Sequence, residues 1–136
     1  NGNHAYHATM PTDGLRLFRD AVHETRDIGF GLVKKAQIDL GVRMRALTEA
    51  YGFVSVAAEG FKAPSVIVNF TDDPDMKSGK KFIEAGLQIA AGVPLEIGES
   101  PNYMSFRIGL FGLDKLMNID RTVDSFDAAL KQITAR

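Results

Sequence analysis

One charged residue, Arg107, stands inside the apolar stretch 105–112, which reads Ser-Phe-Arg-Ile-Gly-Leu-Phe-Gly. Side chains of a strand alternate between its two faces, so Phe106 and Ile108 would point into a core while Arg107 and Gly109 share the opposite face. A guanidinium there offers a planar fork that matches a carboxylate through two parallel hydrogen bonds, and Gly109 would leave open space beside it. Two interpretations follow: a carboxylate-binding arginine, or a surface arginine on the solvated side of a half-buried strand.

A second set of polar groups lies near the start of the chain, in Tyr6-His7-Ala8-Thr9. The hydroxyls of Tyr6 and Thr9 are three residues apart and could both donate hydrogen bonds to a phosphate. The same residues also suit a polar tail whose tyrosine packs elsewhere. His4 and His7 could bind a metal, but a third ligand is missing from their neighbourhood in the sequence.

The segment 92–102 holds two glycines and two prolines and is predicted to be a loop. It lacks the glycine spacings of the known phosphate-binding loops. Glu96 and Glu99 flank its second glycine, where they could act as acid and base or remain solvated charges. The cluster of Lys77, Lys80 and Lys81 is interpreted as the wet face of a helix. From the residues alone, the chain carries no complete catalytic constellation.

Composition limits the class of protein. The chain has 136 residues, 45% of them hydrophobic, which suits one domain with a single core. Sixteen basic residues oppose seventeen acidic ones, which excludes the basic footprint of a nucleic-acid binder. No apolar stretch approaches the roughly 20 residues of a membrane span, so a cytoplasmic location is expected. The absence of cysteine excludes disulfides, thiolate metal sites and a cysteine nucleophile.

Apolar periodicity predicts two consecutive helices in the first part of the chain. Pro11-Thr12-Asp13 indicates a helix start with Thr12 as the N-cap residue. Gly29 and Gly31 interrupt the pattern, and a second helix runs from about residue 32 to 51. Gly52 is well placed to end that helix, whereas Gly41 costs it some stability without breaking it.

Short segments rich in β-branched residues predict strands at 53–56 and 65–70, close enough to pair as antiparallel neighbours. The rest of the chain is predicted to hold a helix over 80–87, a short extended piece at 88–91, a strand over 103–111 and a helix over 121–133. The fold class is therefore α+β, a small, mostly antiparallel sheet of three to four strands covered by helices on one face.

Three segments together resemble the C-terminal part of class V pyridoxal-phosphate-dependent aminotransferases, most of all the alanine–glyoxylate and serine–pyruvate type. They are Tyr6-His7-Ala8-Thr9-Met10-Pro11-Thr12, Gly60-Phe61-Lys62-Ala63-Pro64 and Phe106-Arg107-Ile108-Gly109-Leu110-Phe111-Gly112. The likeness extends over about residues 6–133, and the segments have the order and separation that this family shows.

The resemblance implies a role for each of these polar groups. The arginine at the position of Arg107 binds the substrate α-carboxylate, and the residues matching Tyr6 and Thr9 reach the cofactor phosphate of the neighbouring subunit, which implies a homodimer. The cofactor would be pyridoxal 5'-phosphate. The reaction would move an amino group from a small amino acid, alanine or serine, to a keto acid such as glyoxylate or pyruvate.

The resemblance also implies that this sequence holds no catalytic residue. The family's Schiff-base lysine lies upstream, in a large domain that the sequence lacks. Residues 1–10 would then be an extended remnant of that domain and 11–136 the small C-terminal domain, inactive alone.

Two alternatives stay open at this point. One is a 2-aminoethylphosphonate transaminase or a related class V enzyme, although a cysteine desulfurase is disfavoured because the chain has no cysteine. The other is a non-catalytic α+β binding domain.

Overall fold

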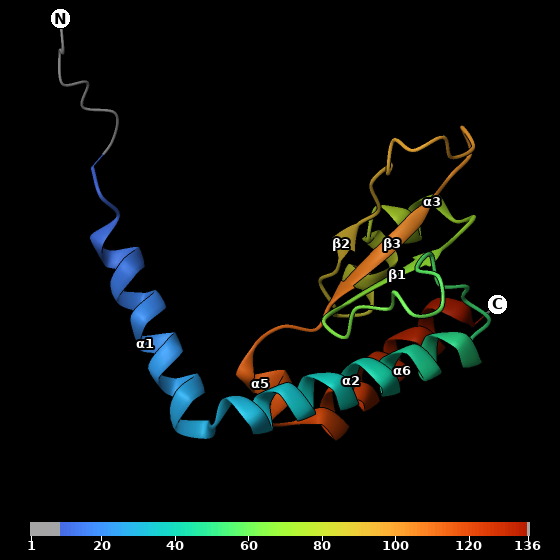
Figure 1. Ribbon diagram of the computed structural model, residues 1–136. Helices are drawn as coiled ribbons and strands as arrows, with labels where there is room; N and C mark the ends of the chain where they lie inside the picture. Colours follow the sequence, from blue (N-terminus) through green and yellow to red (C-terminus); the bar gives the residue numbers. More distant parts are fainter. Residues whose placement is uncertain (1–8, 136) are drawn as a thin grey trace, which may run out of the picture.

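The computed structural model describes residues 9–135 and begins with two long helices, α1 (Thr12–Ile28) and α2 (Phe30–Ala50). Gly29 separates them with φ 105° and ψ 117°, a conformation that glycine adopts readily. The predicted break between the helices is thus confirmed at Gly29, whereas Gly31, which was also expected to interrupt the pattern, lies inside α2. The predicted cap is wrong: Thr12 lies inside α1, and the preceding Pro11 provides no side-chain cap. Figure 1 shows α1 projecting away from the rest of the chain, and none of its residues is buried.

The sheet has three antiparallel strands in the order β1 (Val66–Phe70), β3 (Ser105–Gly109) and β2 (Ala90–Ala91). The central strand β3 therefore pairs on both sides, with Arg107 opposite Val68 on one strand and Ala90 on the other. The helices α2 and α6 (Ile119–Thr134) run along the same side of this sheet (Figure 1). The predicted α+β class with a small antiparallel sheet is confirmed.

The predicted strand at 53–56 is present only in part. Val56 donates its N–H to the Val68 carbonyl and Phe70 donates to Val54, both at 2.9 Å, around a single bridge between Ser55 and Asn69. The antiparallel pairing with β1 was therefore predicted correctly, but it covers too few residues for a regular strand. The chain leaves the sheet after Val56 and enters the irregular segment 57–65.

Short helices fill the connections between the strands. Asp73 accepts hydrogen bonds from the N–H groups of Asp75 and Met76 and so caps α3 (Pro74–Lys77). The following helix α4 (Lys80–Glu84) is shorter than the predicted 80–87, because the chain turns at Gly86, which has a positive φ. The helix α5 (Leu113–Leu116) connects β3 to α6, which begins two residues earlier than predicted.

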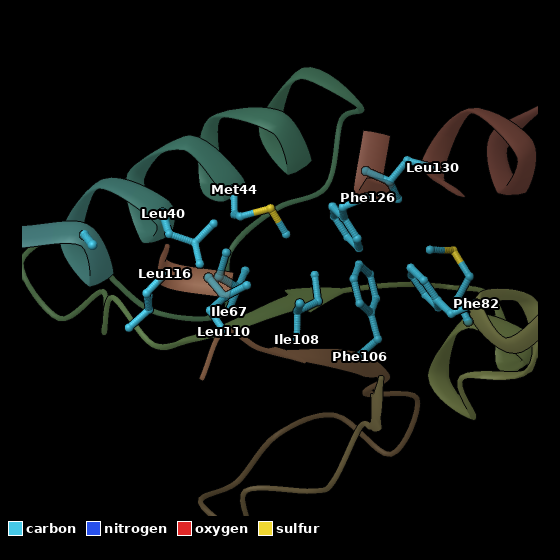
Figure 2. Close-up of a cluster of buried hydrophobic side chains, with 12 residues drawn as sticks. Leu40, Met44, Ile67, Phe82, Phe106, Ile108, Leu110, Leu116, Phe126 and Leu130 are labelled. Atoms are coloured by element: carbon cyan, nitrogen blue, oxygen red, sulfur yellow. The ribbon is translucent and has the colours of Figure 1, made fainter. Parts of the chain in front are cut away.

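The core lies between the sheet and the helices α2 and α6. Figure 2 shows the inward side chains of β3 facing Met44 of α2 and Phe126 of α6. Phe82 of α4 stacks on Phe126 with ring centroids 6.1 Å apart and packs against Phe106 at 5.3 Å. The strand alternation predicted for β3 is confirmed, because Phe106, Ile108 and Leu110 are all buried.

Two residues of α2 fix the segment that leads into β1. Arg45 is buried and donates from Nη2 to the carbonyls of Ala63 at 2.6 Å and Val66 at 3.0 Å. One turn earlier, Gly41 lies so close to Pro64 that a Cβ atom built on it would be 2.5 Å from the proline carbonyl oxygen. This close approach explains why a glycine stands in the middle of the helix. From the sequence alone, Gly41 was interpreted only as a loss of helix stability.

Among residues 9–135, no helix combines the length and the apolar character that crossing a bilayer requires.

Replacing Gly41 with alanine tests this packing. Gly→Ala within a helix ordinarily stabilises by about 1 kcal/mol, but here the methyl group would displace the Pro64 backbone, and we expect a net loss of about 1–3 kcal/mol. Gly31→Ala is the matched control in the same helix, since nothing lies within 4 Å of its Cβ position, and should be neutral or stabilising. Urea unfolding followed by circular dichroism measures both, and equal effects would show that the contact with Pro64 is unimportant.

Candidate functional site

Arg107 lies on the face of β3 opposite the core, as its position in the sequence predicted. Its side chain is partly exposed, and its Nε–H donates to the Ala91 carbonyl at 2.8 Å. Neither terminal nitrogen of the guanidinium forms a hydrogen bond with another residue of 9–135. No carboxylate of residues 9–135 forms an ion pair with Arg107, whereas Arg43, Arg121 and other surface cations are paired. The side chain is therefore oriented by backbone and still able to receive an anion end-on.

The surroundings of Arg107 differ from the prediction at one residue. Gly109 was expected to leave open space on the outer face, but the ring of Phe111 folds back over it. A Cβ atom on Gly109 would lie 3.0 Å from Cε2 and 3.2 Å from Cδ2 of that ring. The glycine thus makes room for Phe111, which is itself more than half exposed. An apolar ring, and not an empty space, therefore occupies the outer face of the strand at Gly109.

The loop 92–102 begins directly after the carbonyl that holds Arg107. Gly92 donates to the Lys77 carbonyl at 3.0 Å and packs so tightly on β3 that a Cβ atom would be 1.7 Å from the Ser105 oxygen. Glu99 organises the far end of the loop, because its carboxylate accepts hydrogen bonds from the N–H groups of Leu95, Glu96 and Ile97. The predicted loop is confirmed, and Glu99 has a structural role that the sequence did not reveal.

Of the residues predicted to bind the cofactor phosphate, the structure describes Thr9 alone. Tyr6, His4 and His7 lie outside the described residues. Thr9 is exposed just before α1, and Figure 1 places that end of the chain far from β3. His23 lies exposed on α1. Within one copy of the chain, the structure therefore does not bring Thr9 and Arg107 together.

Sequence reasoning missed a group of side chains around the loop. The lysine cluster was interpreted as one solvated face, but Lys80 pairs with Asp75 and Lys81 pairs with Asp73, while Lys77 lines a cavity beneath the loop. Tyr103 and Ser105 line the same cavity from the strand side. Ser105 could have been suspected from alternation, since it shares the face of Arg107 two residues away.

The described residues do not form a complete site for pyridoxal phosphate. Such a site needs a lysine for the Schiff base, a carboxylate for the ring nitrogen and a phosphate cradle. Around Arg107 the structure offers one guanidinium and the backbone of Ala91, without a lysine and a carboxylate arranged for those roles. Nor do residues 9–135 contain a group of three or more histidine or acidic side chains that could hold a metal ion.

A scan against protein-family models finds no match to this sequence, and a search of curated proteins finds none either.

The two arginines bonded to backbone carbonyls should differ in their contribution to stability. Arg107→Gln removes one hydrogen bond at a partly exposed site and should lower the free energy of unfolding by less than about 1 kcal/mol. Arg45→Gln leaves two inner carbonyls without their donor and should cost about 2–4 kcal/mol. Urea unfolding of both variants checks this. Equal losses would mean that Arg107 is retained for the fold and would weaken its assignment as a binding residue.

The loop should loosen in acid. The N–H groups of Glu99 itself, Ile97, Glu96 and Leu95 lower the pKa of the Glu99 carboxyl from its ordinary value of 4.5 to about 2. Because the folded pKa is the lower one, this stabilisation is complete above pH 4.5 and is lost as pH falls through about 2. Hydrogen-exchange protection factors of amides 95–97 should fall over that window, and should be low at every pH in Glu99→Gln. Titration of the Glu99 carboxyl near its ordinary value would contradict the expectation.

Proposed function

We propose that this chain is the small C-terminal domain of a class V pyridoxal-phosphate-dependent aminotransferase, in which Arg107 binds the α-carboxylate of a small amino acid. The observation that carries the proposal is the state of Arg107. Its Nε is fixed by the Ala91 carbonyl, and its terminal nitrogens have neither a hydrogen-bond partner nor an acidic partner among residues 9–135. The Tyr6 and Thr9 segment and the segment 106–112 support it through their resemblance to the family.

Arg107 would act by orientation. A carboxylate bound end-on to both terminal nitrogens has its plane and direction fixed, which a lysine ammonium does not achieve. Fixing the carboxylate also fixes the Cα–H bond relative to the group that removes the proton, and such alignment contributes much of the rate in reactions of this kind. Because the strand and the Ala91 bond already hold the guanidinium, little entropy is lost when substrate binds.

The exposed apolar side chains of α1 also support the proposal that this domain belongs to a larger protein. Its apolar side chains Leu15, Phe18 and Val22 follow one another at helical spacing, and all three are exposed, Phe18 by 69%. An amphipathic helix with a bare apolar stripe is stabilised when another surface covers it. In the proposed enzyme that surface belongs to the preceding lysine-bearing domain. We further propose that the enzyme is a cytoplasmic homodimer whose substrates are alanine or serine and a keto acid such as glyoxylate or pyruvate.

The test uses the complete gene product, purified with pyridoxal phosphate and titrated with alanine, serine or 2-aminoethylphosphonate without a keto acid. A visible absorbance band that bleaches with alanine or serine is the expected result. The Arg107→Gln variant should need at least about tenfold more amino acid for the same bleaching, because the loss of a charge-assisted pair costs about 1.5–3 kcal/mol of binding free energy. Arg121→Gln is the matched control and should behave as the unmodified enzyme, since Arg121 is an exposed cation already paired with Asp114.

Two other outcomes are informative. Bleaching by 2-aminoethylphosphonate alone would move the assignment to the phosphonate transaminases. A colourless protein that takes up no cofactor would overturn the enzymatic proposal and leave a non-catalytic α+β binding domain.

A further inference from the structure

The loop 92–102 covers a cavity of about 540 Å³ between itself, α3 and the end of β3. Among its lining side chains, the polar groups of Lys77, Glu96, Tyr103 and Ser105 have no hydrogen-bond or ion-pair partner within residues 9–135 and are free to recognise a ligand. We propose that this cavity is a binding site for a free α-amino acid in its zwitterionic form. The proposal does not depend on the aminotransferase assignment, and Arg107 is not among the lining residues.

Two buried hydroxyl groups at the cavity have no hydrogen-bond partner within residues 9–135. They are the Oγ of Ser105, a residue with 1% of its surface exposed, and the phenolic oxygen of Tyr103. Buried hydroxyls without partners are rare because each loses its bond to water on folding, so an unpaired pair at one cavity indicates a polar occupant. Both can donate a hydrogen bond to a carboxylate oxygen.

Two opposite charges line the same cavity. Lys77 forms no salt bridge with any described residue, although Lys80 and Lys81 beside it are paired with Asp75 and Asp73. The Glu96 carboxylate is likewise unpaired within the described residues, and it does not pair with Lys77. An ammonium and a carboxylate that face one void without reaching each other suit a ligand that carries both charges.

The charges also exclude simpler ligands. A doubly charged anion such as phosphate would be attracted by Lys77 but repelled by Glu96 and by Glu99, which also lines the cavity. A simple cation would be attracted by Glu96 but repelled by Lys77. An α-amino acid satisfies both: its carboxylate would bind Lys77 and the two hydroxyls, and its ammonium group would bind Glu96.

The loop backbone is built to hold Glu96 in place. Glu96 is the only non-glycine residue of 9–135 with a positive φ, 59°, a conformation that is unfavourable for a side chain of this kind. It persists because Glu99 binds the N–H groups on both sides of it as well as its own. Strained residues that their surroundings hold firmly gather at binding sites, which agrees with a recognition role for Glu96.

The experiment titrates the uniformly ¹⁵N-labelled full chain with L-alanine, and separately with acetate and with methylammonium. We expect L-alanine to shift the amide resonances of Lys77, Glu96 and Ser105 and to saturate in the millimolar range, as for a ligand of few atoms. Acetate and methylammonium should each bind at least about tenfold more weakly, because each meets only one of the two charges. This comparison needs no variant, so it does not depend on any substitution folding correctly.

Substitutions then locate the site. Lys77→Met and Glu96→Gln should each weaken alanine binding about tenfold or more. Lys34→Met on α2 and Glu84→Gln on α4 make the same changes of charge outside the cavity and should leave it unchanged. Alanine shifts that disappear only in Arg107→Gln would overturn this site and support the proposed function instead. The absence of shifts at the cavity, or acetate binding as strongly as alanine, would overturn the proposal without bearing on Arg107.

Discussion

The burial of the apolar side chains of β3 on a single face is the constraint from which the arrangement of the candidate sites follows. Phe106, Ile108 and Leu110 are all buried, in the same cluster to which α2 contributes Met44 and α6 contributes Phe126 (Figure 2). Since strand side chains alternate, the residues between them are forced to the other side. A shift of one residue in register would place the guanidinium of Arg107 among aromatic rings, so core packing and the position of Arg107 stabilise each other.

The register of β3 depends in turn on how β1 enters the sheet. Arg45 binds the carbonyl of Val66, the first residue of β1, and that of Ala63 before it, while Gly41 allows Pro64 to lie directly on α2. Burial lowers the pKa of the Arg45 guanidinium, and the carbonyls offset part of this cost by accepting its hydrogen bonds. A helix residue thus fixes the start of a strand, and this strand aligns Arg107 opposite Val68.

The parts of the fold that were predicted correctly are those with local signals. Apolar periodicity predicted both long helices, and the positions of Gly29 and Gly52 predicted where they end. The alternation of apolar residues predicted which face of β3 is buried. The predictions failed where contacts between residues far apart in the sequence determine the local structure. Gly41 is explained by Pro64, which no local pattern connects to it, and the outer side of Gly109 is filled by the ring of Phe111.

Of the candidate site residues, Arg107 could be singled out because a lone charge in an apolar strand is visible in the sequence. Lys77 could not be singled out in this way, because it differs from Lys80 and Lys81 only in having no ion-pair partner among the described residues, and the sequence does not show those pairs.

The helix α1 differs from β3 in the burial of its apolar side chains: those of β3 are packed in the core, whereas those of α1 have nothing to pack against. Its visible ion pairs, Arg19 with Asp20 and Arg26 with Asp27, join sequence neighbours at the surface, and pairs of this kind contribute little stability. Isolated helices of about this length are marginal in water, so α1 gains most from a surface that covers its stripe. If that surface is the domain of the proposed enzyme, α1 carries the beginning of the described chain away from β3, the strand that holds Arg107 (Figure 1). One copy of the chain would then contribute to two different active sites, which is the arrangement that a homodimer with shared sites requires.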